Sequence, residues 1–310
     1  MKLYKKKYSP PNVFLSLEHL LKLEVFSSTL QISDSKNKSN SILSGQYASK
    51  LRGRGLDFEE VRPYIFGDDI RNIDWKVTAK TGKTHTKIFT EEKEKPVFIF
   101  VDQSSSMGFG SKNKTKAFVA GEIASIIAHK TKKKGDRVGG LVFGEDYEII
   151  TPKRDARNSI YFLQKIVEAN QNIYNYDIKD FDNSLAEMFA KVNNIVTHDY
   201  VVFIISDFHR YNPAVIKYLS QLGLHNDIIM IKVFDELEDH IPNAQLTITN
   251  KTKQINLNGK NSKTKEKVEA TFEKEFTDFK SELSKYNITL LKVNCCNPIE
   301  EELLEVFSNL

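Results

Sequence analysis

Residues 97–108 read VFIFVDQSSSMG, and this stretch decides the fold. Its first five residues are apolar and β-favouring, which is typical of a strand buried on both faces. Two similar runs follow along the chain, YVVFIIS at residues 200–206 and DIIMIKV at residues 227–233. Helical patterns alternate with these runs, so the sequence predicts an α/β fold with a doubly wound, mostly parallel sheet flanked by helices.

Further elements extend this sheet along the chain. The spacing of apolar residues predicts helices at residues 13–26, 114–133, from Asp155 onward, 183–193 and 213–222, and two strands at residues 137–143 and 147–151. After Phe234 the pattern predicts a hairpin at residues 244–258, a long charged helix at 265–286, a strand at 288–293 and a terminal helix at 299–307.

These elements divide the chain into four parts. Residues 1–46 hold an N-terminal helix and a flexible link, and residues 47–96 form a polar segment packed on the core. Residues 97–235 form the α/β domain, and residues 236–310 form a C-terminal α/β elaboration. The N-terminal helix is amphipathic, so we expect it to pack on the body of the protein, with a membrane-surface helix as the alternative.

Composition limits the classes of protein that this chain can belong to. It has 310 residues, of which 40% are hydrophobic and 28% charged, as in soluble globular proteins. The formal net charge of +4 argues against a dedicated nucleic-acid binder, and the lysine runs at residues 5–7 and 132–134 read as solvated surface. No segment reaches the ~18–20 apolar residues of a membrane helix. The two cysteines, Cys295 and Cys296, are adjacent and make no disulfide framework, so we expect a cytoplasmic protein in which they are core residues rather than a redox switch.

Oxygen-bearing side chains follow two of the apolar strands. Asp102, Ser104 and Ser106 alternate along the chain, so an extended backbone would point all three toward one side. Asp207 follows the strand at residues 200–206 and would reach the same sheet edge, where open parallel sheets bind their ligands. Carboxylate and hydroxyl oxygens are ligands that suit Mg²⁺ or Mn²⁺, so we predict a site for one of these ions.

Different stretches of the sequence resemble two known families. The run D-x-S-x-S after a buried strand, with a later strand-end Asp, resembles the metal-ion-dependent adhesion site of von Willebrand factor A domains. Upstream, GRGLDFEEVRPY at residues 53–64 and GDDIRNIDW at residues 67–75 are similar to the signature GRG-hEFxExRxYxxGDDxRxIDW of the bacterial domain-of-unknown-function family fifty-eight. FDELE at residues 234–238 resembles that family's D-x-x-E element. The resemblance covers roughly residues 44–307, and its signature residues here are Arg54, Glu59, Arg62, Tyr64, Gly67, Asp68, Asp69, Arg71, Asp74 and Trp75.

The resemblance implies a function as well as a fold. It implies a von Willebrand A-like domain over residues 97–235 and a gene that lies beside that of a MoxR-type AAA+ ATPase. The protein would then be an adaptor rather than an enzyme, working with that ATPase in complex assembly or maturation, and a client protein would offer an acidic residue to the metal. The metal site of such domains also has a Thr before a helix. Here Asn183 lies nearest the expected place, and Asp182 and Ser184 are the alternatives.

Two alternatives concern catalysis. A metal-assisted hydrolase, either a phosphatase or a nuclease, would use Asp102 and Asp207 with His209 as general base, although the chain has no Gly-rich phosphate loop. The GDD and IDW stretches of residues 67–75 could supply an acid catalytic pair. We favour a structural clamp, in which Arg62 and Arg71 pair with the carboxylates and Trp75 packs beneath them.

Overall fold

The computed structural model describes residues 12–29, 56–91, 95–144, 146–174, 182–209, 211, 213–249 and 254–308. The chain forms two compact units. The sheet unit comprises Met1–Ser33 and Pro96–Leu310, and the signature unit comprises Asp34–Lys95. The predicted link at residues 27–46 begins too early, because residues 27–29 belong to the N-terminal helix. Its remainder, the lysines at residues 5–7 and Arg54 lie outside the described residues.

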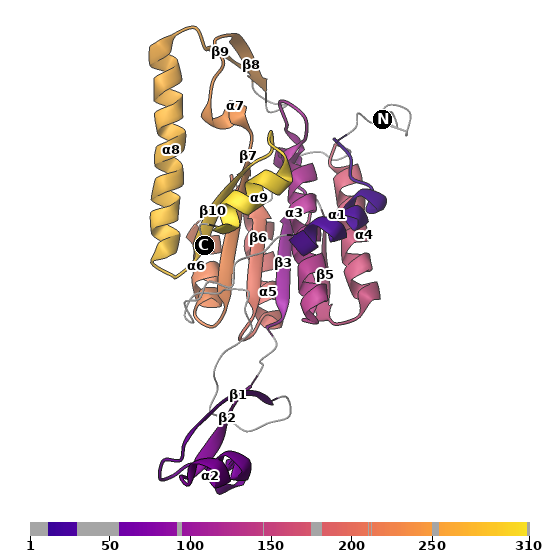
Figure 1. Cartoon of the computed structure of the whole chain (residues 1–310). Helices are drawn as coiled ribbons and strands as arrows, with labels where there is room; N and C mark the ends of the chain where they lie inside the picture. Colours follow the sequence, from indigo (N-terminus) through magenta and orange to yellow (C-terminus); the bar gives the residue numbers. More distant parts are fainter. Residues whose placement is uncertain are drawn as a thin grey trace. The chain divides into compact units, whose positions relative to one another are not determined.

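A six-stranded sheet forms the centre of the sheet unit (Figure 1). Its strand order is β10-β7-β6-β3-β4-β5, and every neighbouring pair is parallel except β4 and β5. The predicted α/β class with a mostly parallel sheet is therefore confirmed. The strands are β3 (Val97–Asp102), β4 (Val138–Phe143), β5 (Tyr147–Lys153), β6 (Val201–Ser206), β7 (Asp227–Phe234) and β10 (Thr289–Asn294).

Helices cover both faces of this sheet. Successive strand residues point to opposite faces, so Phe98 and Phe100 of β3 face one helical layer while Ile99 faces the other. Phe100 stacks on Phe189 at 5.3 Å between ring centroids. The layer around Phe189 contains α5 (Asp182–Ile195), α6 (Pro213–Gly223) and α8 (Ser262–Ser284), and the opposite layer contains α1 (Leu17–Thr29), α3 (Lys116–Lys134), α4 (Ala156–Asn172) and α9 (Ile299–Ser308).

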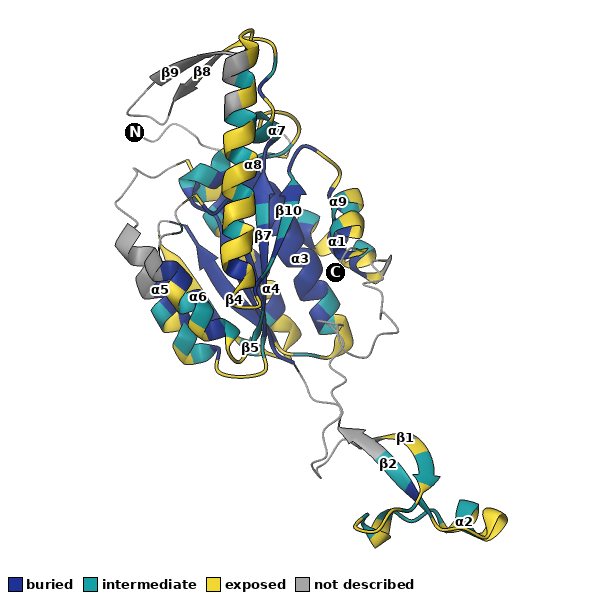
Figure 2. Cartoon of the chain, turned by 90° about the vertical axis from the view of Figure 1, so that its left-hand side faces the viewer, coloured by how far each residue is buried: buried dark blue, intermediate teal, exposed yellow. Residues whose placement is uncertain are grey.

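The helix α3 lies under α1 and is buried almost all round, as the dark blue ribbon in Figure 2 shows. Thr115 caps its first turn, and Gly135 ends it with a φ of 82°, a left-handed conformation that glycine adopts without strain. The hydroxyl of Ser125 donates to the Leu20 carbonyl at 2.7 Å, and Leu20 is itself fully buried. The N-terminal helix therefore packs on the body of the sheet unit, as predicted.

Close packing at β4 depends on a glycine. A Cβ on Gly140 would lie 2.2 Å from the Ile99 carbonyl oxygen and 2.7 Å from the ring of Phe162. The absence of a side chain therefore lets α4 approach the strand, because Phe162 of α4 occupies that space with no exposed surface.

The signature unit contains a hairpin that the sequence pattern does not predict, since charged and apolar residues are mixed there without a single period. Strands β1 (Leu56–Pro63) and β2 (His85–Glu91) pair antiparallel, and between them lie the short helices η1 (Ile70–Asn72) and α2 (Trp75–Thr81). The carboxylate of Asp74 caps α2 by accepting from Lys76 N and Val77 N at 3.0 and 3.1 Å.

The expected clamp is correct in one part and wrong in another. Arg62 pairs with a carboxylate as expected, because its Nη2 donates to Asp68 Oδ1 at 2.8 Å. Arg71 contacts Asp69 Oδ1 through its backbone N at 3.0 Å, which caps η1 and is not the expected pairing of its guanidinium. Trp75, however, is 70% exposed and does not pack beneath these residues. It is the first residue of α2, a helix of 7 residues without a buried side chain, so its ring has no apolar layer of that helix to enter.

The C-terminal elaboration follows the predicted order. A four-residue helix, α7 (Glu236–Asp239), leads into the hairpin of β8 (Gln245–Thr249) and β9 (Gln254–Asn258), and α8, β10 and α9 come after it. Cys295 and Cys296 are both buried, as the core interpretation expected. In the part of the chain that the structure describes, no helix combines the length and the apolarity needed to cross a membrane.

Candidate metal centre

The ends of β3 and β6 bring the predicted site residues to one edge of the sheet. These strands are neighbours, with Val101 opposite Ile205, so the chain emerges from both at the same level. Asp102 and Asp207 are both buried, with 5% and 1% of their surface exposed. The carboxylate of Asp102 also reaches the neighbouring strand directly, because Ser206 Oγ donates to Asp102 Oδ2 at 2.6 Å.

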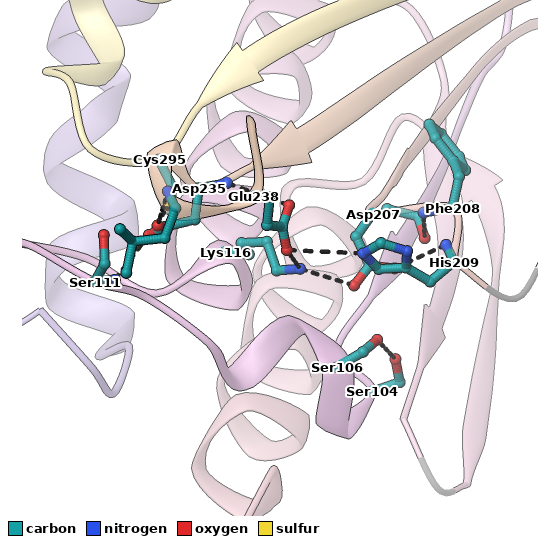
Figure 3. Close-up of polar contacts among 12 residues, drawn as sticks. Ser104, Ser106, Ser111, Lys116, Asp207, Phe208, His209, Asp235, Glu238 and Cys295 are labelled. Carbon is teal, nitrogen blue, oxygen red and sulfur yellow. Dashed lines mark hydrogen bonds and ion pairs between the residues drawn. The ribbon is translucent and has the colours of Figure 1, made fainter. Parts of the chain in front are cut away.

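The D-x-S-x-S run is a tight turn rather than the extended chain that we expected. Asp102 Oδ1 accepts from the backbone N of Ser104 at 2.8 Å, and this bond reverses the chain into the 3-10 helix η2 (Ser105–Gly108). The two hydroxyls still meet, since Ser104 Oγ and Ser106 Oγ lie 3.3 Å apart (Figure 3). The turn therefore gathers these oxygens by backbone curvature instead of by strand alternation.

Lys116, at the start of α3, is a site residue that the sequence analysis missed. Its Nζ lies 3.0 Å from Asp207 Oδ2 and 2.5 Å from Glu238 Oε1, with 2% of the side chain exposed (Figure 3). Burial alone would lower the pKa of Lys116, but the Asp207 and Glu238 carboxylates outweigh it and raise the pKa. Lys116 is therefore a buried ammonium ion that ties the β6 loop to α7.

His209 lies at the outer side of this cluster. Its backbone N donates to Asp207 Oδ1 at 3.2 Å, and its Nε2 is 3.7 Å from Glu238 Oε1, with half of the side chain exposed. The contact with Glu238, followed by the charge of Asp207, raises the pKa of His209. The imidazole is thus biased toward its protonated form, in which it has no lone pair to accept a proton.

A buried tyrosine completes the surroundings of the two aspartates. Tyr211 follows the same loop, and its hydroxyl is buried without a hydrogen-bond partner among the described residues. Burial is the main cause that raises the pKa of Tyr211, and the charges of Asp102 and Asp207 add to it. A polar atom buried without a partner is rare, and a ligand is one way to satisfy it.

The residues present fit a hard divalent cation. Asp102, Asp207 and Glu238 bring three carboxylates to this region, and the Lys116 ammonium group lies against two of them. Both oxygens of Asp102 accept from neutral donors, and burial followed by repulsion from Asp207 raises the pKa of Asp102. A cation beside Asp102 would relieve this repulsion, and the oxygen donors suit Mg²⁺ or Mn²⁺.

The fifth ligand of the predicted site falls where side chains are not described. Asp182, Asn183 and Ser184 form the first turn of α5, but their side chains lie outside the described set, as does that of Glu59 in β1. The identity of the residue that takes the place of the usual Thr stays a prediction.

An open pocket borders the site where β3 and β4 end. Gln103 and Ser105, from within the D-x-S-x-S turn, form one side of it. The β4–β5 turn, β5 and α4 line the rest, and their charged residues there are Asp146, Glu148, Lys165 and Glu168. The turn that follows Asp102 therefore forms part of the wall of a pocket.

A signal for Lys116 was present in the sequence. In the helix that begins at residue 116, Lys116 occurs in the run KAFVAGEIA, where every residue through Ile127 is buried. A lysine within an otherwise buried helical face must have a charged partner, because an isolated buried ammonium is costly. Glu238 was quoted in the D-x-x-E element, but nothing in the local pattern indicates that it would meet a helix 122 residues earlier in the chain.

Comparisons with known proteins agree with the motifs. A family model with the description "Protein of unknown function DUF58" matches residues 60–280. The uncharacterized proteins Mb1516 of Mycobacterium bovis and Rv1480 of Mycobacterium tuberculosis are each 31% identical over 132 residues, which is 43% of this chain. The match spans 42% of the length of these curated relatives.

The matches to solved structures have low sequence identity and low TM-scores. The conserved hypothetical protein BatB from Bacteroides thetaiotaomicron matches with 14% identity and a TM-score of 0.43, over 69% of this chain and 97% of that chain. A von Willebrand factor type A protein from Catenulispora acidiphila matches with 14% identity and a TM-score of 0.36, over 72% of this chain and 44% of that chain.

Proposed function

This chain belongs to the DUF58 family of proteins of unknown function, and on that premise we propose that it is a metal-dependent protein-interaction module. Its ion is Mg²⁺ or Mn²⁺, and its role is that of a cytoplasmic adaptor for a MoxR-type AAA+ ATPase in complex assembly or maturation. The observation that supports this proposal is the buried pair of carboxylates beside hydroxyls at the carboxyl edge of the sheet.

The residues that would hold the ion are Asp102, Ser104, Ser106 and Asp207. When bound, the ion supplies a Lewis-acidic position that a carboxylate from another protein can fill. The protein residues do the rest: Ser206 fixes the orientation of Asp102 by its hydrogen bond, and Lys116 holds Asp207 in place through its ammonium group.

The hydrolase alternative has less support from the site. A general base at neutral pH needs an unprotonated nitrogen, and Glu238 with Asp207 raises the pKa of His209. We therefore propose an adaptor without its own hydrolase activity.

Metal binding is tested by calorimetry and thermal unfolding with Mg²⁺ or Mn²⁺. An ion that binds only the folded state stabilises it by about 2.7 kcal/mol at a hundredfold excess over Kd. We expect this stabilisation in the wild type and its loss in Asp102→Ala. His209→Ala is the matched control, because it lies at the same edge outside the proposed ligand set and should bind the ion as the wild type does. No binding heat and unchanged melting across the titration would refute the metal site.

The adaptor role is tested with a purified MoxR-type ATPase from the same organism. Binding is measured by interferometry without nucleotide, so that the magnesium requirement of the ATPase itself does not enter. We expect binding that requires Mg²⁺, is lost in Asp102→Ala and persists in His209→Ala. A panel of phosphoester, nucleotide and peptide substrates is assayed in parallel. Turnover that disappears in both variants would replace the adaptor proposal with the hydrolase.

A further inference from the structure

A second cluster of ligand atoms lies where β7 and β10 end, and it consists of a carboxylate and two thiols. Asp235, Cys295 and Cys296 are buried, and their ligand atoms all lie within 4.8 Å of one another. The two sulfur atoms are 3.4 and 3.5 Å from the same oxygen, Asp235 Oδ2. Parallel pairing of β7 with β10 brings them together, because Phe234 lies opposite Asn294 in the register. Asp235 and Cys295 follow these two residues directly, and Cys296 comes next.

We propose that this cluster is a site for a thiophilic divalent cation of the zinc class. Thiolate sulfur selects borderline and soft metals, and a carboxylate oxygen is a common companion ligand for zinc. Two adjacent cysteines and one aspartate supply three ligands. Ser111 lies against the cluster, with its Oγ 3.8 Å from Cys296 Sγ, so its hydroxyl or a water molecule can fill the fourth position (Figure 3).

The surroundings of Asp235 favour a cation there. Its Oδ2 accepts from Ser111 N at 2.7 Å and its Oδ1 accepts from Leu237 N at 2.9 Å, so its described hydrogen bonds come from neutral groups. A buried carboxylate whose hydrogen bonds come from neutral donors has an unpaired negative charge, and a cation at the thiols would stabilise it. Each thiol that coordinates the metal releases its proton to solvent, so binding becomes tighter as the pH rises.

The cluster is also within reach of solvent on one side. Ser111 is exposed while its backbone contacts Asp235, and Lys112 beside it is paired with Glu236 at the surface. A metal ion can therefore enter through the segment that precedes α3 without unfolding the sheet. This site differs from the candidate metal centre in its chemistry, since sulfur ligands discriminate against Mg²⁺.

Cadmium is a suitable probe, because its bonds to thiolates give an ultraviolet charge-transfer band. The chain has 2 cysteines, so any such band reports this pair. The full-length protein is reduced with a phosphine and titrated with Cd²⁺. We expect the band to saturate at about one ion per chain and Zn²⁺ to displace it, as competition for one tetrahedral site requires.

Variants identify the ligands. Cys296→Ser is expected to weaken the band strongly, and Asp235→Asn to weaken cadmium affinity while leaving both thiols present. Because Asp235 also caps α7, circular dichroism must first show that this variant is folded, and Cys296→Ala provides a second test that leaves the cap intact. Asp102→Ala is the control that separates the two sites, since it should lose Mg²⁺ binding and keep the cadmium band.

Three results would overturn the proposal. One is a folded, reduced wild-type protein that shows no cadmium band at saturation. Another is a cadmium affinity that stays at the wild-type value in both single variants, folded Asp235→Asn and Cys296→Ala. The third is rapid oxidation of the pair to a disulfide in air with no metal affinity after reduction, which would make the pair a redox element.

Discussion

The two units of the chain place their large apolar side chains in opposite ways. The strands at the centre of the sheet unit are dark blue in Figure 2. Phe98 and Phe100 of that unit have at most 1% of their surface exposed. In the signature unit, Phe66 is 98% exposed and Trp75 is 70% exposed, and Ile65 and Ile70 are also on the surface. The sheet unit thus obtains its stability from burial, whereas the signature unit displays side chains of the kind that interaction surfaces use.

Charged groups differ between the units in the same way. Lys116 and Asp207 form an ion pair with 2% and 1% of their side chains exposed, whereas Arg62 and Asp68 retain 32% and 21%. Screening by water weakens the second pair and not the first. Removal of a charge should therefore matter far more at the sheet edge than in the hairpin, although both belong to the region that the family shares.

The largest expected effect comes from the core of the sheet unit. Phe100→Ala removes a ring that stacks on Phe189, and such changes cost about 3–5 kcal/mol of unfolding free energy. Phe66→Ala in the signature unit should change it by less than about 0.5 kcal/mol, because the ring is already in water. Urea unfolding followed by far-ultraviolet circular dichroism measures both. Similar losses in the two variants would show that the contrast in burial is not a contrast in stability.

The buried ammonium gives the next effect. Lys116→Met leaves Asp207 and Glu238 without their cation, and loss of one partner of a buried pair costs about 3 kcal/mol. Added Mg²⁺ should restore part of this loss and should stabilise the variant more than the wild type. Lys112→Met, at a surface pair with Glu236, is the control and should change stability far less. If Lys116→Met left the unfolding free energy unchanged, both with and without Mg²⁺, Asp207 and Glu238 would not need a neighbouring cation.

Acid should affect the sheet unit before the signature unit. Burial lowers the pKa of His129 below its ordinary 6.5, and its Nε2 donates to the Leu20 carbonyl of α1. Its contribution to stability is present above pH 6.5 and is lost as the pH falls toward the lowered pKa. In the signature unit, the Val77 N–H lowers the pKa of Asp74 from 3.8, so its contribution is lost only as the pH falls below 3.8.

These pH ranges can be separated by two probes. Trp75 is the single tryptophan of the chain, so its fluorescence follows the signature unit, while circular dichroism follows mainly the helices of the sheet unit. The dichroism signal should change first on acidification, and His129→Gln should reduce the dependence of unfolding free energy on pH just below 6.5. A fluorescence change that comes first would contradict this order.

The smallest effect concerns Trp75 itself. With 70% of the ring exposed, Trp75→Ala should alter unfolding free energy by less than about 0.5 kcal/mol, and wild-type emission should be that of an indole in water, open to acrylamide quenching. A shift of this emission to shorter wavelength on addition of a partner protein would locate the contact. A loss of several kcal/mol on substitution would mean that Trp75 is part of a core after all.

The sequence predicted the strands that consist of apolar residues throughout, and it did not predict the strands that mix apolar and charged residues. The run VFIFV predicts β3 because a strand buried on both faces is apolar at every position, and the same holds for β6. The hairpin of β1 and β2 alternates weakly, since most of its described residues are not buried, and so it leaves no periodic signal. The exposure of Trp75 contradicts the usual preference of large aromatic residues for burial, and no local pattern indicates it.

The site was predictable where it depends on strand ends and not where it depends on distant contacts. Asp102 and Asp207 follow two strands that the topology makes neighbours, so their meeting follows from the fold. The contact of Lys116 with Glu238 joins residues 122 positions apart, and that of Asp235 with Cys295 joins residues 60 apart. Such contacts require the relative placement of β7, β10 and α3, which periodicity alone does not give.

The short helix α7 connects the two clusters at this end of the sheet. Asp235 caps its first turn and holds the thiols, while Glu238, three residues later, accepts from Asp235 N at 3.4 Å and contacts Lys116. This turn therefore links Asp235, a ligand of the thiol cluster, to Glu238, which pairs with Lys116 beside the candidate metal centre. By thermodynamic reciprocity, if an ion bound at one cluster changes the ion affinity of the other by some factor, an ion bound at the second cluster changes the affinity of the first by the same factor. If α7 couples the two clusters, the ion affinity measured at one of them reports whether an ion is bound at the other.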